Sequence, residues 1–242
     1  IPLCPYDSCR LLAINLLSYV DKPFTKEASF NFEKFKQHVE KAMRMMDDII
    51  DLELEKIELI INKIAADPED EDIRRVELEL WKKIRTMARK GRRTGLGITA
   101  EGDMLAALGL RYGTPEATAF AVKVQKTLAL EAYRASVKMA AERGAFEIFD
   151  ARKEEKNPMI GRIREADPEL YAEMVKHGRR NIAMLTIAPT GTSSLMSQTT
   201  SGIEPVFRPV YKRRRKINPS DQDAKVAFVD DMGETFEEHN VY

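Results

Sequence analysis

The run Pro-Thr-Gly-Thr-Ser-Ser at positions 189–194 has residue types that can bind a phosphate group. The apolar stretch 182–188 before it predicts a buried strand, and residues 195–198 can begin a helix. A turn from a strand into a helix gathers unpaired backbone N–H groups at the positive end of the helix dipole. The sequence therefore indicates an anion-binding turn at this point of the chain.

The side chains of this turn suit an anion as well. Gly191 lets the backbone come close to a bulky ligand, while Thr190, Thr192 and Ser193 can add hydroxyl donors. The alternative interpretation is that a Ser or Thr side chain simply caps the helix, as is common after a strand. Taken alone, the residues leave both interpretations open.

The cysteines Cys4 and Cys9 are a second source of reactive groups. Two thiols in a cytosolic chain do not make a disulfide framework, and their separation does not match a Cys-x-x-Cys motif. No other Cys or nearby His completes a zinc site. The histidines, for which surface positions are expected, are His38, His177 and His239.

Three neighbouring acids, Asp47, Asp48 and Asp51, suggest a metal cluster by their residue type. No partnering His or Glu-x-x-His motif accompanies them, so we interpret them as a solvated helix face. No bound metal is therefore expected.

The composition of the 242-residue chain is that of a globular protein without a strong overall charge. Hydrophobic residues make up 43%, which permits a sizeable core, and 39 basic residues balance 39 acidic ones. Zero net charge does not favour nucleic acid or an acidic membrane as a partner. No apolar run is long enough to cross a bilayer and no secretory signal is visible, so a cytoplasmic location is expected.

The order of strand and helix patterns predicts an α/β fold. Strands are expected at 11–16 and 92–99. The glycines of the second strand indicate either a close approach of backbone or a bend at a barrel wall. The expected helices are 32–64, 73–87, 101–108, 115–143 and 168–178.

Two stretches carry more specific expectations. The basic run 212–216 could be a nucleic-acid patch when taken alone, but in a neutral chain a strand edge or a subunit surface suits it better. The helix after the acidic turn 67–72 is expected to bury its apolar stripe. That stripe consists of Ile73, Val76, Leu80, Ile84 and Met87.

Together, three motifs in order and at matching spacing resemble the large, catalytic subunit of ribonucleotide reductase. The resemblance covers nearly the whole chain. The motifs are Ile-Pro-Leu-x-Pro-Tyr-x-x-Cys at 1–9 with Leu-Ala-Ile-Asn-Leu at 12–16, Arg-Arg-Thr-Gly-Leu-Gly-Ile-Thr at 92–99 with Gly-Asp-Met-Leu at 102–105, and Ile-Ala-Pro-Thr-Gly-Thr-Ser-Ser at 187–194 with Ser-Gly-Ile-Glu-Pro at 201–205.

The resemblance implies both a fold and a reaction. The chain would form part of the family's ten-stranded α/β barrel, with residues 1–215 in the barrel and 216–242 beginning a following segment. The parent enzyme would be a ribonucleoside-diphosphate reductase, which makes deoxyribonucleotides by thiyl-radical chemistry. Residues 207–216 look most like the adenosylcobalamin-dependent branch (class II), so adenosylcobalamin is the expected cofactor.

The resemblance also assigns site residues. Cys9 matches one of the two cysteines that reduce the ribose 2′ carbon and end as a disulfide, and its partner would lie outside this chain. Cys4 departs from the family pattern, so Cys9 is the preferred reducing thiol. The residues that match the turn holding the substrate's phosphates are Pro189, Thr190, Gly191, Thr192 and Ser193.

The expected partners are a ribonucleotide substrate, a thioredoxin-like or other dithiol reductant, the remainder of the reductase chain, and a second copy in a homodimer. In the family an Asn-Pro-Cys-Gly-Glu motif, whose Cys carries the radical, immediately precedes the segment that begins at Ile1. The chain alone is therefore expected to be inactive. The alternative is a non-catalytic nucleotide-binding or assembly module from a split gene.

Overall fold

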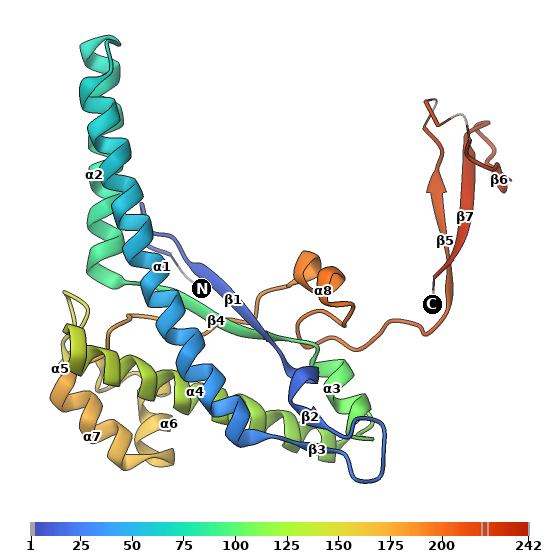
Figure 1. Cartoon of the computed structure of the whole chain (residues 1–242), viewed down its shortest axis with the longest axis horizontal. Helices are drawn as coiled ribbons and strands as arrows, with labels where there is room; N and C mark the ends of the chain where they lie inside the picture. The colour runs from blue at the N-terminus through green and yellow to red at the C-terminus, as the bar shows by residue number, and fades with distance from the viewer. Residues whose placement is uncertain (1–2, 219, 222, 242) are drawn as a thin grey trace. The chain divides into compact units, whose positions relative to one another are not determined.

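The computed structural model describes residues 3–218, 220–221 and 223–241. The chain divides into two compact units, Ile1–Pro205 and Val206–Tyr242 (Figure 1). The domain boundary expected after residue 215 concerns the longer barrel, and it stays a prediction.

The centre of the first unit is a pair of parallel strands, β1 (Arg10–Asn15) and β4 (Thr94–Thr99). Their register runs from Arg10 opposite Thr94 to Asn15 opposite Thr99. An extended segment follows the other edge of β4, where Thr94 N donates to Ala183 O at 3.0 Å and Thr186 N to Leu96 O at 3.0 Å. Parallel pairing brings the carboxyl ends of all three segments to one edge of the sheet.

This third segment corrects the strand expected at 182–188. Its pairing with β4 amounts to one parallel bridge, between Leu96 and Leu185. Beyond Thr186 the segment leaves the ladder, and Ile187 is 50% exposed. The prediction of a fully buried strand was therefore wrong at this end, because the segment crosses over β4 rather than continuing beside it.

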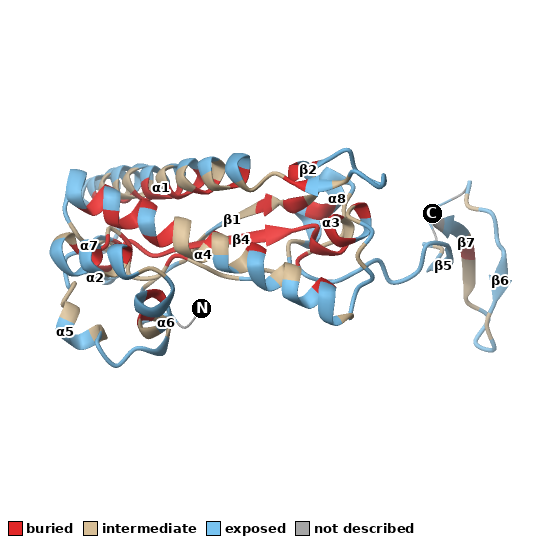
Figure 2. Cartoon of the chain, turned by 90° about the horizontal axis from the view of Figure 1, so that it is seen from below, coloured by how far each residue is buried: buried red, intermediate tan, exposed pale blue. Residues whose placement is uncertain are grey.

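Two glycines in β4 allow that crossing, as the glycine pattern predicts. A Cβ on Gly97 would lie 2.2 Å from Thr186 O, far inside contact distance. A Cβ on Gly95 would lie 2.8 Å from Cys9 Sγ and 2.9 Å from Thr186 Cγ2. The strand is buried along its whole length (Figure 2). A side chain added to it would therefore collide with a packed neighbour.

Three long helices build the rest of the first unit, and their ends follow local sequence signals. α1 (Phe32–Ala66) is unbroken and begins at Asn31, whose side chain accepts from Lys34 N at 3.0 Å. α4 (Pro115–Arg143) begins with Pro115 after the cap Thr114 and ends at Gly144, as predicted. α2 (Glu71–Gly91) runs beside α1 (Figure 1).

α2 does not bury the stripe that its periodicity predicts. Ile73, Val76 and Leu80 are 52%, 59% and 43% exposed. The helix contacts α1 through a different side, on which Ala88 is buried and Arg85 binds Glu58 of α1 at 2.7 Å. The periodicity identified an apolar stripe correctly. It could not show that the described residues leave this stripe exposed.

The core of the first unit joins the strands to these helices. Its buried residues include Ile14, Leu96 and Ile98 from the sheet, together with Val39 of α1 and Leu128 of α4. The α/β class is confirmed.

The shorter elements are η1 (Leu16–Tyr19), β2 (Val20–Asp21), β3 (Ser29–Phe30), α3 (Glu101–Ala107), α5 (Ala151–Glu154), α6 (Pro158–Ala166), α7 (Pro168–His177) and α8 (Gly191–Ser197).

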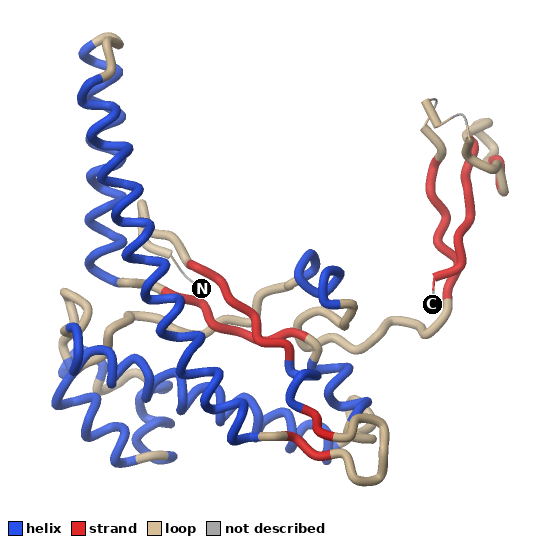
Figure 3. The backbone as a smooth tube through the Cα atoms, viewed as in Figure 1, coloured by secondary structure: helices blue, strands red, loops and turns tan. Residues whose placement is uncertain are grey.

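The second unit is a small antiparallel sheet of β5 (Tyr211–Lys216), β7 (Thr235–Val241) and β6 (Phe228–Val229), in the order β5-β7-β6. Figure 3 shows β5 and β7 side by side. The basic run forms an edge strand, as predicted, and Arg214 binds Glu238 of β7 at 2.8 Å. No helix in the described part of the chain has the length and apolar character that a membrane span requires.

We expect Gly97→Ala to destabilise the protein, because the added methyl group would collide with the backbone oxygen of Thr186. Forcing extra volume into such a contact costs roughly 1–3 kcal/mol. Gly161→Ala in α6 is the matched control, since nothing lies within 4 Å of its added Cβ. Thermal unfolding of both variants measures the difference, and an unchanged midpoint for Gly97→Ala would contradict the close crossing.

Candidate functional site

Two helices begin side by side where the parallel segments end. α3 follows β4 directly, and α8 follows the extended segment at Thr190. The hydroxyl groups of Thr99 and Thr190 are 3.1 Å apart, so the two strand ends are in contact. Ligands commonly bind at the carboxyl edge of parallel strands, where helix N-termini converge.

The structure does not support the interpretation of the 189–193 turn as an ordinary helix cap. Thr190 occupies the left-handed region at φ 53°, and its side chain makes no capping hydrogen bond. Its hydroxyl instead accepts from Gly202 N at 2.8 Å and contacts Thr99. Thr190 is therefore a structural link, and its hydroxyl is already engaged rather than free for a ligand.

The start of α8 keeps free donors where an anion would sit. Within the described part of the chain, no group accepts a hydrogen bond from the N–H of Gly191, Thr192 or Ser193. All three residues are exposed. A Cβ on Gly191 would meet nothing within 4 Å, so the open space beside it is available to a ligand. The arrangement can bind an anion through backbone N–H groups with help from two hydroxyls.

Cys9 lies against the same sheet, before the start of β1. Its sulfur packs over Gly95, and Thr186 contacts that glycine from the other edge. Burial raises the pKa of the Cys9 thiol above its ordinary 9.0, and the charge of Arg93 offsets part of this rise. The thiol therefore carries its proton at neutral pH. Cys4, by contrast, is exposed, and both cysteines are free.

The thiol and the turn lie along one strand. Cys9 contacts Gly95, and the turn is joined to Thr99 through Thr190. Four residues of β-strand separate these two points, which corresponds to about 13 Å. The sheet therefore places a thiol and a turn with free N–H donors at a separation that an extended small molecule can bridge.

The second and third sequence motifs hold each other in place. Thr200 N donates to Asp103 Oδ2 at 2.7 Å, and Ala100 N donates to Thr200 O at 3.0 Å. A Cβ on Gly102 would lie 2.7 Å from Pro205 Cα, so this position too needs glycine. These contacts fix the segment after α8 against the start of α3. The sequence patterns did not reveal this mutual support.

Glu101 is a buried carboxyl group that sequence reasoning missed. It opens α3 and is only 7% exposed, in a cavity of about 790 Å³ that α4 and α6 also line. Burial raises the pKa of Glu101 above its ordinary 4.5, although a 3.1 Å hydrogen bond from Gln125 Nε2 works against that rise. An acid that follows a strand is a weak signal in sequence alone, because surface acids are common at helix starts.

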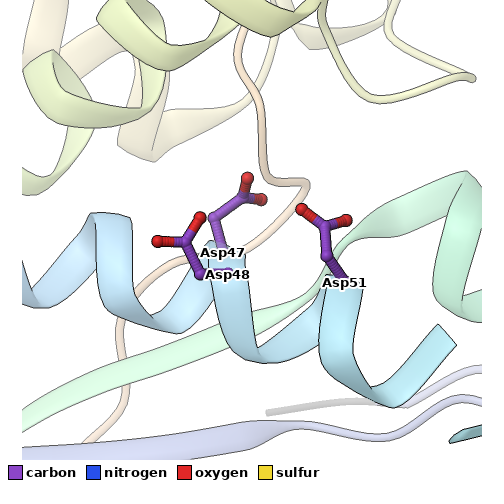
Figure 4. Close-up of side chains that lie close together, drawn as sticks. All are labelled: Asp47, Asp48 and Asp51. Atoms are coloured by element: carbon purple, nitrogen blue, oxygen red, sulfur yellow. The ribbon is translucent and has the colours of Figure 1, made fainter. Parts of the chain in front are cut away.

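Arginine side chains already bind the acidic cluster on α1. Carboxylate oxygens of Asp47, Asp48 and Asp51 lie within 4.8 Å of one another (Figure 4). The Asp47 carboxylate is already bound, however, because Arg92 Nε donates to it at 2.8 Å and Arg180 Nε at 3.1 Å. A dication there would have to displace guanidinium groups. The expectation that these acids hold no metal stays a prediction.

The expectation of a solvated face is wrong for Asp47, whose side chain is completely buried. Burial by itself would raise its pKa, but hydrogen bonds and charges from Arg92 and Arg180 outweigh it. The pKa of Asp47 therefore lies below its ordinary 3.8. Asn181 Nδ2 also donates to Asp47 at 3.1 Å. This one carboxylate ties α1 to the start of β4 and to the segment that leads to the turn.

Comparison with known proteins supplies a family context. The family model described as "Ribonucleotide reductase, barrel domain" matches residues 1–234. The chain is 29% identical over 214 residues to a vitamin B12-dependent ribonucleoside-diphosphate reductase of Mycobacterium tuberculosis, covering 88% of this chain and 23% of that protein. It is 32% identical over 212 residues to a protein of the same name from Thermoplasma acidophilum, covering 88% and 22%. The chain thus spans less than a quarter of the length of these curated relatives.

A solved structure gives the same picture for the fold. The alpha subunit of a class Id ribonucleotide reductase from Actinobacillus ureae superposes with a TM-score of 0.53 at 20% identity. The likeness covers 81% of this chain and 28% of that one. At this identity it concerns the fold alone.

We expect Asp47→Asn to destabilise the protein by about 3 kcal/mol, because it leaves the buried Arg92 without its main counter-charge. Asp48→Asn is the matched control. Asp48 is 50% exposed and binds Arg143 alone among the described residues, so its loss should cost under about 1 kcal/mol.

The pH dependence gives this prediction a second measurement. A lowered pKa means that the Asp47 carboxylate stabilises the fold above pH 3.8 and loses that effect as the pH falls further. Chemical denaturation at several pH values should show the gap between wild type and Asp47→Asn narrowing below 3.8. A gap that stays constant there would argue against the ion pair as its cause.

Proposed function

Because the chain belongs to the ribonucleotide reductase family, we propose that it forms part of the catalytic barrel of an enzyme that reduces ribonucleotides to deoxyribonucleotides. The observation that carries the proposal is the shared sheet of Cys9 and the 189–193 turn. One end of the sheet offers a protonated thiol, and the other offers free N–H donors for an anion. A phosphorylated sugar has both a group to be reduced and a group to be anchored.

In this proposal Cys9 supplies half of the reducing power. Replacing the 2′ hydroxyl of the ribose by hydrogen consumes two electrons and two protons and releases water. Two thiols provide them by forming one disulfide, and a dithiol protein then restores the pair by exchange. The raised pKa of Cys9 suits this task, because the thiol keeps the proton that it must deliver. Cys4 is exposed and makes no contact with β4 comparable to that of Cys9 at Gly95.

The phosphate groups of the substrate would bind at the 189–193 turn. The N–H groups of Gly191, Thr192 and Ser193 are donors, and the Thr192 and Ser193 hydroxyls add two more. Pro189 and Thr190 have a different role here. Pro189 leads the chain into the turn, and Thr190 fixes it to Thr99 and Gly202. Substrate position would therefore be set by the backbone rather than by a cationic side chain.

We propose adenosylcobalamin as the radical source of the complete enzyme, since the two curated relatives described above are named vitamin B12-dependent. That cofactor supplies the radical chemistry when bound. The described residues do not by themselves form a cradle for it. The cavity of about 790 Å³ beside Glu101 includes neither Cys9 nor the 189–193 turn among its lining residues.

The relatives' names also favour ribonucleoside diphosphates as substrates. A dithiol protein is the proposed reductant, because thiol–disulfide exchange restores an oxidised cysteine pair. A cytoplasmic location fits an enzyme whose thiols must be kept reducible. A non-catalytic nucleotide-binding module would use the turn to bind phosphate, but it would have no use for the Cys9 thiol. A test of Cys9 therefore separates the two functions.

We expect Cys9→Ser in the complete enzyme to abolish multiple turnover while leaving substrate binding nearly unchanged, because the disulfide can no longer form. Cys4→Ser is the matched control and should have a mild effect. Deoxynucleotide formation with dithiothreitol, followed over many turnovers, provides the measurement. If Cys4→Ser stopped turnover instead, or if Cys9→Ser kept full activity, Cys9 would not be the reducing thiol. Nucleotide binding without any deoxynucleotide formation by the wild type would favour the non-catalytic module.

We expect Thr192→Val to weaken substrate binding by about tenfold or more, because a hydrogen bond to a charged group is worth roughly 1.5–3 kcal/mol. The fold should be unaffected, since Thr192 is exposed. Ser197→Ala is the control within α8, because its hydroxyl contacts Ser193 O and not the free side of the turn. Calorimetric titration with substrate would decide. Unchanged affinity in Thr192→Val would remove this hydroxyl from the phosphate site.

A further inference from the structure

α3 and α8 begin in the same backbone conformation, but a distant segment of the chain fills the start of α3. The residues before the two helices, Ala100 and Thr190, both occupy the left-handed region, at φ 63° and 53°, and neither side chain caps its helix. At α3, Ala100 N donates to Thr200 O at 3.0 Å. Glu101 N donates to Gly202 O at 3.3 Å. At α8 the equivalent N–H groups have no acceptor among the described residues.

Thr200 and Asp103 form a reciprocal pair that caps α3. Thr200 Oγ1 accepts from Asp103 N at 3.3 Å, and Asp103 Oδ2 accepts from Thr200 N at 2.7 Å. A capping box contains the same two bonds, but there the Ser or Thr stands directly before its own helix. Here the Thr comes 97 residues after the Asp. This split capping box therefore joins two segments as well as closing the end of a helix.

The split capping box also holds the residue that precedes α8. A chain of hydrogen bonds runs from the Thr190 hydroxyl to Thr99 Oγ1 at 3.1 Å, and from the Thr99 hydroxyl to Thr200 O at 3.0 Å. Gly202 N donates to Thr190 Oγ1 at 2.8 Å. A non-glycine residue keeps a left-handed conformation where its surroundings impose it. The direction of the first N–H groups of α8 therefore depends on the loop that Thr200 anchors.

We propose that Thr200 and Asp103 are positioning residues for the 189–193 turn, a role that rests on the phosphate site proposed for that turn. The start of α3 takes two carbonyl oxygens and one hydroxyl oxygen, so a junction of this shape binds oxygen acceptors. The split capping box holds the second such junction open for the oxygens of a phosphate. A carboxylate opposes a nearby anion by its charge, so Asp103 can favour phosphate only through the position of the turn.

Calorimetric titration of the complete enzyme with a ribonucleoside diphosphate tests Thr200. Thr200→Val removes the hydroxyl with little change of shape. It should raise the dissociation constant about three- to tenfold, the size expected for one lost capping hydrogen bond. Thr200→Ser restores the hydroxyl and should bind as the wild type does. Thr199→Val is the matched control, because the Thr199 hydroxyl contacts Ser197 and takes no part in the split capping box.

The same titration separates positioning from a general loss of fold. A variant that is merely destabilised would show fewer binding sites with an unchanged dissociation constant, and that result for Thr200→Val would overturn the proposal. Thr192→Val separates the proposal from the function on which it rests. Weaker binding in Thr192→Val beside wild-type affinity in Thr200→Val would refute the positioning role alone. Wild-type affinity in both variants would refute the phosphate site as well.

A double-variant cycle tests the pairing of the two side chains. Asp103→Ala should weaken binding as Thr200→Val does, and the double variant should be no weaker than the weaker single one, because both changes break the same pair. Asp103→Asn keeps a side-chain oxygen for Thr200 N and should retain wild-type affinity. Additive losses, or tighter binding in Asp103→Ala, would mean that Asp103 acts apart from Thr200 and would rule out the split capping box as the positioning device.

Discussion

The missing side chains at Gly95 and Gly97 are the constraint on which the rest of the first unit depends. β4 is buried between β1 and the segment that leads to α8, so any side chain on its inner positions would push a neighbour away. Without them, Cys9 can lie at Gly95, and the Thr186 carbonyl can cross directly over Gly97. The crossing in turn carries the chain to Thr190, where it meets the end of β4. The thiol and the anion-binding turn are thus positioned by the same strand.

A close crossing of this kind needs an anchor, because van der Waals contact alone does not fix the register of an irregular segment. Asp47 provides that anchor at the start of the segment. Its buried carboxylate binds Arg92, which precedes β4, and both Arg180 and Asn181, which begin the approach to the turn. Three segments that are distant in sequence therefore share one counter-charge. Removing the charge would leave several buried donors unpaired at once, which is costly in an apolar interior.

The sequence predicted best those features whose causes are local. Asn31, Thr114 and Gly144 mark helix ends through hydrogen bonds within a few residues, and α1 and α4 begin and end accordingly. It failed where the cause is a distant partner. Asp47 looks like a surface acid until Arg180, 133 residues away, is brought beside it. The stripe on α2 looks like a buried face, although Ile73, Val76 and Leu80 are exposed in the described part of the chain.

The contrast between local causes and distant partners also applies to the candidate site. The sequence located the site, but it could not assign the role of each residue there. The 189–193 turn was identified from its residue types, yet those types suggested that Thr190 would serve a ligand or a cap. Its hydroxyl makes no capping hydrogen bond and instead contacts Gly202 N and Thr99. That contact leaves the first N–H groups of α8 free, since no side chain caps them. A threonine that links the turn to β4 therefore leaves the first N–H donors of α8 uncapped, and residue type alone cannot reveal this role.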